Sequence, residues 1–220
     1  MQAIDLEQAR TNMIINQVRA WEVLDEHVLA TLRQVPREQF VAPQHRALAF
    51  ADMMLPLGDG EVMFAPKYEA RFLQGLAPRP HDRVLEVGTG SGYMAALLAA
   101  CAGRVTSVDI NAGFVEQAGA RLRTLGFDNV ALATGDASAG WPQAGPYDVV
   151  MISGSLPVFP EELRDQVKPG GRIGVVIGSE PAMEALIYRN VGRGRWETES
   201  MFEMVVPPLR NARQIQRFVF

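Results

Sequence analysis

The most regular pattern in this chain begins at residue 83, where short apolar runs alternate with longer segments of helical spacing. The apolar runs fall near 83–87, 104–109, 129–133, 147–153 and 171–178, and such runs are typical of buried parallel strands. Helical spacing fills 91–101 and 113–125, and a short helix over 161–167 ends at a Lys-Pro-Gly-Gly sequence. This alternation predicts an α/β fold with a doubly wound parallel sheet.

The segments on either side of this core have a different pattern. Residues 5–18 and 25–34 have helical apolar spacing, another helix starts at Pro66, and Leu55 to Gly60 is irregular and turn-rich. After residue 178, the runs 185–188, 201–206 and 216–220 predict strands joined by turns, which fits antiparallel strands added to one edge. We therefore expect one compact domain, with an N-terminal helical extension over 1–80 and the sheet core over 81–220.

Glycines follow the first core strand at alternate positions, Gly88, Gly90 and Gly92, and a helix starts directly after them. A strand that turns through glycines into a helix brings backbone N–H groups close to a ligand. Dinucleotide-binding folds require a third glycine at position 93, which is Tyr93 here, so a nicotinamide-dependent oxidoreductase is the least favoured enzyme. The alternative is a turn that serves only tight packing.

Acidic residues follow the next two strands. Asp109 ends the strand at 104–109, about 20 residues beyond the glycines, where such folds hold a ribose diol. It could also be the N-cap of the helix that starts near Asn111. Asp136 follows the strand at 129–133 and could be an ordinary turn residue. Because the three motifs end three consecutive strands, we expect them to form one cofactor site.

Composition excludes several other classes of function. The formal net charge of −4 gives no basic field for nucleic acid. Cys101 is the only cysteine and the three histidines are scattered, so we expect no disulfide and no metal site. The start of the chain lacks the pattern of a signal peptide, and no apolar run reaches the length of a membrane span. We expect a cytoplasmic protein without membrane association; its oligomeric state is not predicted.

The sequence E-x-G-x-G-x-G that starts at Glu86 resembles the first motif of Rossmann-like S-adenosylmethionine-dependent methyltransferases. The resemblance implies S-adenosyl-L-methionine as the cofactor and S-adenosyl-L-homocysteine as the product. It implies that Asp109 binds the ribose and Asp136 the adenine amino group. The cofactor-binding residues expected from it are Glu86, Gly88, Thr89, Gly90, Ser91, Gly92, Asp109, Ile110, Asp136, Ala137 and Ser153.

Further strings extend this resemblance to one family. They include Val35–Val41 (VPREQFV), Leu55–Gly58 (LPLG), Glu86–Tyr93, Leu125–Val130 and Lys168–Gly171. Together they resemble the protein-L-isoaspartate O-methyltransferases, which methylate isoaspartyl residues in damaged proteins. The resemblance implies a Rossmann-like methyltransferase fold, isoaspartyl peptides or proteins as substrates, and residues 1–80 covering the substrate side.

One loop departs from the family pattern. Between Gly60 and Pro66 the family carries Gln-Thr-Ile-Ser, and its serine lies beside the transferring methyl group, whereas this chain has Glu61-Val62-Met63-Phe64. Phe64 therefore occupies the position of the family's serine. The residues expected to contact the substrate are Val62, Met63, Phe64, Ala65 and Ser155.

The chemistry remains feasible without those hydroxyls. A carboxylate acceptor has a pKa of about 4 and is already ionised at neutral pH, so methyl transfer needs no general base and depends on positioning. The first hypothesis is therefore an isoaspartyl carboxyl methyltransferase. A relative that methylates another acceptor is the second, with Met63 and Phe64 lining an apolar pocket. A cofactor-binding or interaction module without transferase activity is the third.

Overall fold

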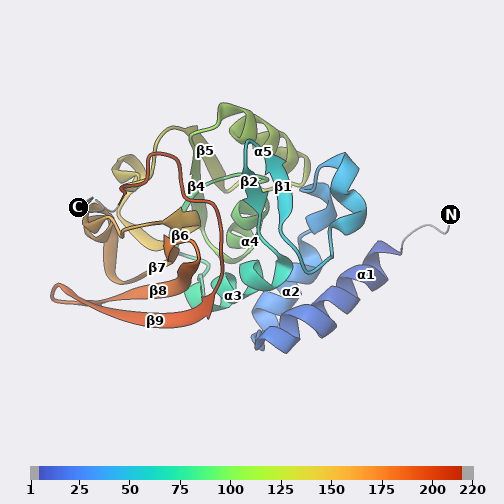
Figure 1. Ribbon diagram of the computed structural model, residues 1–220, viewed down its shortest axis with the longest axis horizontal. Coiled ribbons are helices and arrows are strands. Elements are labelled where there is room, and N and C mark those ends of the chain that lie inside the picture. Colours follow the sequence, from blue (N-terminus) through green and yellow to red (C-terminus); the bar gives the residue numbers. More distant parts are fainter. Residues whose placement is uncertain (1–4, 215–220) are drawn as a thin grey trace.

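The computed structural model describes residues 5–214, and its centre is a seven-stranded sheet with the order β5-β4-β3-β6-β7-β8-β9 (Figure 1). The first five strands in this order pair in parallel, whereas β8 pairs antiparallel with β7 and β9 antiparallel with β8. The strands are β3 (Arg83–Val87), β4 (Arg104–Asp109), β5 (Val130–Thr134), β6 (Tyr147–Leu156), β7 (Val167–Ser179), β8 (Ala182–Gly192) and β9 (Arg195–Glu203). The predicted α/β sheet with antiparallel edge strands is confirmed.

The edge strands differ in extent from the prediction. The strand expected over 185–188 is the middle of a much longer strand, and the strand expected over 201–206 is only the end of β9. Between β8 and β9 the chain reverses at Arg193 and Gly194, which both have positive φ angles (54° and 72°), as a two-residue hairpin turn requires. The third expected strand, 216–220, lies outside the described residues.

Alternating apolar side chains place a core on each face of the sheet. In β3, Val84 joins one buried cluster and Leu85 and Val87 join the other, as the two-residue period of a strand requires. Three helices pack on the first face, α3 (Pro66–Leu76), α4 (Tyr93–Cys101) and α5 (Ala112–Thr124). The second face is covered by 3-10 turns over Pro142–Ala144 and Glu161–Gln166 and by the segments around them.

The N-terminal part packs on the helices of the first face (Figure 1). Helix α1 (Leu6–Met13) continues as a π-helical stretch over Ile14–Val18 and a 3-10 turn over Arg19–Trp21, so the predicted helix over 5–18 changes its winding at residue 14. Helix α2 (Glu26–Gln34) is capped by Asp25, whose carboxylate accepts from the His27 and Val28 amides, and it ends before Pro36. Shorter 3-10 turns follow over Arg37–Gln39 and Pro43–Leu48.

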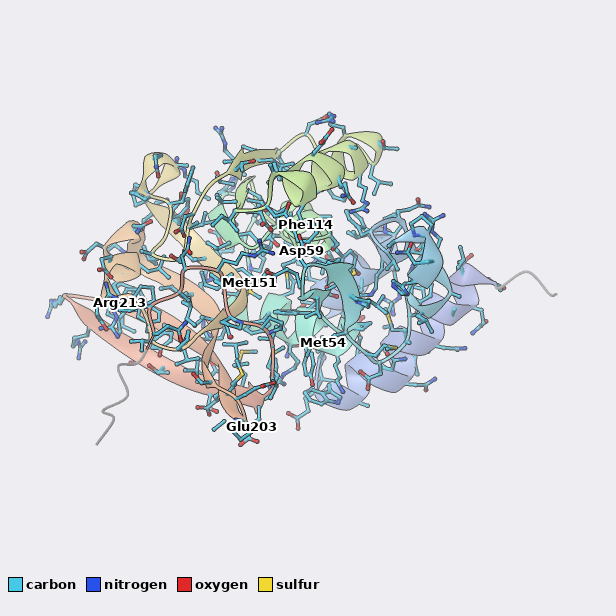
Figure 2. All side chains as sticks on the ribbon, turned by 45° about the horizontal axis from the view of Figure 1, so that its top comes forward. Met54, Asp59, Phe114, Met151, Glu203 and Arg213 are labelled. Carbon is cyan, nitrogen blue, oxygen red and sulfur yellow. The ribbon has the colours of Figure 1, made fainter. Side chains whose placement is uncertain are left out.

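A β-hairpin forms where an irregular segment was predicted. Strands β1 (Leu55–Gly58) and β2 (Glu61–Met63) pair antiparallel, and the turn between them has positive φ angles at Asp59 (53°) and Gly60 (82°). Asp-Gly is a favoured pair for such a turn because both positions need left-handed backbone. The hairpin tip lies next to the start of α5, as the neighbouring Asp59 and Phe114 show in Figure 2. There Asn111 Nδ2 donates to Asp59 at 3.1 Å.

One buried cluster contains residues from Met13 to Val206, so the N-terminal helices and the sheet share a core. Within residues 5–214, no helix is both long and apolar enough to cross a membrane.

Arg172 of β7 joins the end of α3 to the sheet. Its guanidinium donates to the carbonyls of Leu76 and Ala77 and to Asp82 at 2.7 Å, and its side chain is only 7% exposed. These bonds satisfy carbonyls that the last turn of a helix leaves without partners.

We predict that Arg172→Met lowers the free energy of unfolding by about 3–5 kcal/mol, because it leaves Asp82 and two carbonyls without their cation. Urea unfolding measures the loss. The exposed Arg195→Met in β9 is the control and should change stability by about 0.5 kcal/mol or less. Equal unfolding midpoints for the two variants would contradict this role.

Candidate functional site

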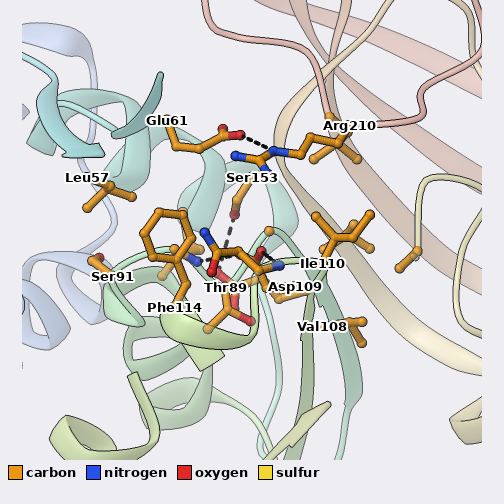
Figure 3. A pocket seen from close by; sticks show the side chains of 18 of the residues that line it. Leu57, Glu61, Thr89, Ser91, Val108, Asp109, Ile110, Phe114, Ser153 and Arg210 are labelled. Atoms are coloured by element: carbon orange, nitrogen blue, oxygen red, sulfur yellow. Dashed lines mark hydrogen bonds and ion pairs between the residues drawn. The ribbon is translucent and has the colours of Figure 1, made fainter. Parts of the chain in front are cut away.

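A pocket opens at the carboxyl ends of β3, β4 and β5, where open α/β sheets bind their ligands. The hairpin β1–β2 and the segment around Leu209 and Arg210 form its opposite wall (Figure 3). Its lining residues include Leu57, Glu61, Val62, Met63, Phe64, Glu69, Glu86, Gly88, Thr89, Gly90, Ser91, Val108, Asp109, Ile110, Phe114, Asp136, Ala137, Ser153, Leu209 and Arg210.

The amides of the three loop glycines are bonded within the protein. Gly88 N–H donates to Val108 O at 2.8 Å, Gly90 N–H to Asp109 Oδ2 at 2.9 Å, and Gly92 N–H to Thr89 O at 2.8 Å. The amides of these three glycines are therefore engaged within the protein, and Gly88 and Gly90 serve the pocket through the space that they leave. A pyrophosphate would need those amides free, which argues against a dinucleotide site.

The glycines allow close packing in two different places. At Gly90 (φ 48°) an added Cβ would lie 2.9 Å from Leu57 on the far wall of the pocket. At Gly92 (φ 86°) it would lie 2.9 Å from the Ala118 Cβ of α5, and Gly92 does not line the pocket. Gly92 therefore serves helix packing, while Gly88 and Gly90 border the space for a ligand.

Asp109 holds the glycine loop and the start of the next helix together. Its Oδ2 accepts from Gly90, and its Oδ1 accepts from the Asn111 amide at 2.8 Å. The N-cap of α5 is Asn111, whose side chain accepts from Gly113 at 2.9 Å, so Asp109 is not the cap. The carboxylate is 9% exposed and borders the pocket.

Asp136 borders the pocket beyond β5. Its Oδ1 accepts from the Ser138 amide at 2.9 Å, and its Oδ2 accepts from Asn211 Nδ2 at 3.0 Å. The Ser138 amide, together with Asn211, lowers the pKa of this carboxyl below its usual value. Asp136 is therefore both a turn residue, which accepts from the Ser138 amide, and a lining residue of the pocket.

Glu86 is the innermost carboxyl of the pocket. It accepts from Ser107 at 2.6 Å and from Ser153 at 3.3 Å (Figure 3), and Ser107 also bonds Thr89 at 2.6 Å. Burial raises the pKa of Glu86 to about 8, although both serine bonds favour the ionised form.

The loop over Val62–Phe64 forms the wall nearest α3. All three side chains line the pocket, and Phe64 stacks on Phe72 of α3 with ring centroids 6.2 Å apart. Phe64 O accepts from Arg37 Nη2 at 2.6 Å. This wall therefore presents the apolar residues Val62 and Phe64 at the positions where the family resemblance implies threonine and serine.

Arg37 lies behind that wall and is fully buried. It donates to Ala49 O at 2.7 Å, to Phe64 O and to Glu69 Oε2, and its guanidinium stacks 4.9 Å from the ring centre of Tyr93. Glu69 lies in the first turn of α3 and lines the pocket. Burial raises the pKa of Glu69 to about 8, because desolvation outweighs the attraction of Arg37.

Two residues expected at the substrate lie elsewhere. Ala65 is the buried N-cap position of α3 and does not line the pocket. Ser155 is fully buried, and its hydroxyl donates to Val206 O at 3.0 Å. Strict alternation along β6 would place Ser155 beside Ser153, but the strand is irregular between Met151 and Ser155, where four steps pair with two steps of β7.

Several lining residues were not identified from the sequence. Phe114 lies three residues after Asn111, the N-cap of α5, and a signal for it was its place in the first turn of the helix that follows Asp109. Glu69 and Arg210 gave no signal, because their place at the pocket depends on packing between distant segments. Arg210 Nε lies 3.3 Å from Glu61 Oε1 and thereby joins the C-terminal segment to the hairpin (Figure 3).

The charges of the lining favour a cationic ligand. Five lining residues carry carboxyls, Glu61, Glu69, Glu86, Asp109 and Asp136, and Arg210 is the single basic residue of the lining. Because burial raises the pKa values of Glu69 and Glu86 to about 8 and Glu61 is paired with Arg210, the negative charge comes from Asp109 and Asp136. A methionine-type sulfonium or ammonium group suits this surface, whereas the phosphates of a dinucleotide do not. Among residues 5–214, no group of three His, Cys, Asp or Glu side chains could hold a metal ion.

Comparisons with known proteins agree on one family. The model of the protein-L-isoaspartate(D-aspartate) O-methyltransferase family matches residues 9–211. A protein-L-isoaspartate O-methyltransferase of Methylorubrum extorquens (strain PA1) is 39% identical over 205 residues, which cover 93% of this chain and 90% of the relative. One from Rhodopseudomonas palustris (strain HaA2) is 39% identical over 178 residues, 81% of this chain and 73% of the relative.

Solved structures agree on the fold. A protein-L-isoaspartate O-methyltransferase structure superposes with a TM-score of 0.77 at 25% identity, covering 92% of this chain and 65% of its own. Another, from Plasmodium falciparum in complex with S-adenosyl-L-homocysteine, has a TM-score of 0.79 over 94% of this chain and 99% of its own. At 16% identity, the second supports the fold alone.

We predict that Asp109→Ala weakens the binding of S-adenosylhomocysteine by about tenfold or more, because it removes a pocket carboxylate and releases Gly90. Calorimetry measures the affinity. Asp25→Ala, which removes the N-cap of α2, is the control and should cost about 1 kcal/mol of stability without changing the affinity. Unchanged affinity in Asp109→Ala would assign this residue a purely structural role.

Proposed function

The chain belongs to the protein-L-isoaspartate(D-aspartate) O-methyltransferase family, and from this we propose that it transfers a methyl group from S-adenosylmethionine to the carboxylate of isoaspartyl residues in proteins. The observation that carries the proposal is the pocket at the ends of three consecutive parallel strands. It brings Glu86, Asp109 and Asp136 to one acidic cavity beside a glycine turn.

The cofactor would be held by residues at the carboxyl ends of β3, β4 and β5. Asp109 and Asp136 end neighbouring strands, so their carboxylates suit the ribose hydroxyls and the adenine amino group, with Ile110 and Ala137 as apolar neighbours. Gly88 and Gly90 leave space for the methionine part, and Glu86 and Ser153 lie at the inner end. The bound cofactor supplies an activated methyl group, which makes it an electrophile toward a carboxylate.

The protein's remaining task is to orient the acceptor. Because a carboxylate acceptor is ionised at neutral pH, no side chain has to remove a proton from it. The apolar wall of Val62, Met63 and Phe64 would exclude water from the reacting groups and limit the poses that the acceptor can take. Residues 55–64 of the N-terminal part form this wall, which supports the interpretation that residues 1–80 cover the substrate side.

The hydroxyl-free wall also keeps a second candidate function open. Val62 and Phe64 stand where the family resemblance implies threonine and serine, and Phe64 fills part of the wall with an aromatic ring. A different acceptor, or cofactor binding without transfer, would be compatible with an intact cofactor site. Methyl transfer from labelled S-adenosylmethionine to an isoaspartyl peptide, beside the matching aspartyl peptide, separates these functions.

We predict that S-adenosylmethionine and S-adenosylhomocysteine raise the melting temperature, because a ligand that binds the native state stabilises it, and that NAD has little effect. Gly90→Val should abolish the shift, since its side chain would occupy the gap between the glycine loop and Leu57. Differential scanning fluorimetry with each compound tests this. A flat response of the unaltered chain to both methionine-derived compounds would refute the cofactor assignment.

Restoring the missing hydroxyls should increase isoaspartyl methylation. In the double variant Val62→Thr, Phe64→Ser, the hydroxyls can orient a carboxylate and the aromatic ring no longer limits its approach. A hydrogen bond to a charged group is worth about 1.5–3 kcal/mol, which corresponds to about ten- to a hundredfold in rate. We therefore predict a rise in kcat/KM of about tenfold, measured with labelled cofactor.

The loss of Phe64 packing on Phe72 makes a stability control necessary, because removing a buried phenylalanine costs about 3–5 kcal/mol. Phe64→Ala alone provides it, since this variant has the cavity without the hydroxyls. A double variant that binds cofactor but ignores isoaspartyl peptides would favour another acceptor. Efficient methylation of isoaspartyl peptides by the unaltered chain would show that hydroxyls at positions 62 and 64 are not needed, and would contradict the prediction.

A further inference from the structure

Glu69 is a buried carboxyl at the pocket that the cofactor site does not use. It lies one helical turn beyond Ala65, and its amide donates to Ala65 O at 3.3 Å, so it stands directly behind the loop that ends at Phe64. Its side chain is 3% exposed, yet it lines the same pocket as Phe64 and Glu86. The wall expected to face the acceptor therefore contains one polar side chain close to the position where the hydroxyls are missing.

The two oxygens of Glu69 have different surroundings. Oε2 accepts from Arg37 Nη1, and Arg37 in turn donates to Phe64 O, so one guanidinium fixes both the carboxyl and the loop. Among the hydrogen bonds of residues 5–214, the Glu69 side chain takes part through Oε2, which leaves Oε1 available to the pocket that Glu69 lines. A neutral carboxylic acid suits this arrangement, because it can accept from Arg37 through one oxygen and donate an O–H from the other.

We propose that Glu69 is a substrate-positioning residue, which holds its proton on Oε1 and donates it in a hydrogen bond to the acceptor carboxylate. This inference rests on the proposed function, since it concerns a carboxylate acceptor. Glu69 would then supply the hydrogen bond that Val62 and Phe64 cannot make. A hydrogen bond between a carboxylic acid and a carboxylate is charge-assisted and stronger than one between neutral groups.

The surroundings of Glu69 favour its neutral form. Burial raises its pKa to about 8, and the groups that face it are Arg37 from the 3-10 turn, Glu86 from β3 and Tyr93 from α4. Of these groups, only Arg37 favours the ionised form of Glu69. Glu86 opposes it when charged, and an acceptor carboxylate would oppose it further, because two adjacent carboxylates share a proton more readily than they both ionise.

The alternative role of Glu69 is a general base, and the charges disfavour it. A carboxylate acceptor has no proton to lose. A base with a pKa near 8 would also be mostly protonated at neutral pH, and would increase activity as pH rises. Donation predicts the opposite, since the donor is lost when pH rises through the pKa of Glu69.

Two variants of Glu69 separate these roles. Glu69→Gln keeps an oxygen for Arg37 and gains an amide that donates at every pH, whereas Glu69→Met keeps the approximate shape and loses both oxygens. Glu38→Gln is the matched control, because Glu38 is a buried carboxyl that accepts from Arg10 at 2.7 Å and does not line the pocket. Melting temperatures and affinity for S-adenosylhomocysteine verify that each variant folds and retains the cofactor site.

The first measurement is kcat/KM for an isoaspartyl peptide between about pH 6 and pH 10. We expect the unaltered chain and Glu38→Gln to lose activity as pH rises past about 8, in line with the pKa of Glu69. Glu69→Gln should match the unaltered chain at neutral pH within about threefold and show no alkaline loss of that origin. Glu69→Met should be about ten- to a hundredfold less active at neutral pH, with affinity for the peptide reduced in the presence of S-adenosylhomocysteine.

The second measurement is independent of turnover. Infrared difference spectra of the unaltered chain against Glu69→Gln should contain the carbonyl stretch of a protonated carboxyl at neutral pH, and this band should disappear at alkaline pH. Its absence at neutral pH would overturn the inference, as would an alkaline loss of activity that persists unchanged in Glu69→Gln. If no variant methylates the isoaspartyl peptide at any pH, the proposed function fails and the acceptor role of Glu69 fails with it.

Discussion

The buried hydrogen bond from Arg37 to Glu69 is the interaction on which the arrangement of the pocket depends. A guanidinium inside a protein is tolerated only when its N–H groups find acceptors, and each hydrogen bond to such a charged group is worth about 1.5–3 kcal/mol. Arg37 meets this requirement with Ala49 O, Phe64 O and Glu69, while its face stacks on Tyr93. The N-terminal extension, the loop before α3 and the first helix of the core are thereby held at one point, next to the pocket.

This constraint explains how a parallel sheet acquires a closed site. The ends of β3, β4 and β5 provide carboxylates but only one wall, since all three face the same edge. The other wall comes from residues 55–64, whose hairpin is held at its tip by Asn111 and, on its second strand, by Arg210. Because Arg37 binds the carbonyl of Phe64, one contact that holds the wall does not involve the Phe64 side chain. The loop can therefore change this side chain without losing that contact.

Local sequence predicted the core because its signals are local. The strands of the parallel sheet follow from runs of apolar residues, and the glycine turn follows from its spacing after β3. The hairpin at 55–63 had a usable signal in Asp59-Gly60, but the short strands around it lack clear alternation. Arg193-Gly194 is a similar turn between β8 and β9. The full length of these strands was not predicted, because β9 is an edge strand exposed along much of its length, and only its last residues stand out as an apolar run in the sequence.

Glu69 and Ser155 illustrate why the remaining site residues could not be predicted. A glutamate in the first turn of a helix normally faces solvent, where its negative charge interacts favourably with the helix dipole. Only the fold reveals that this face of α3 is buried against Arg37, a residue 32 positions earlier. Ser155 fails for the opposite reason, since the sequence period predicts a pocket position and an irregularity in β6 removes it. In both cases the deciding contact joins segments far apart in the chain, Arg37 with Glu69 and Ser155 with Val206. For Glu69 the chemistry also depends on burial, which decides its protonation and which no local pattern specifies.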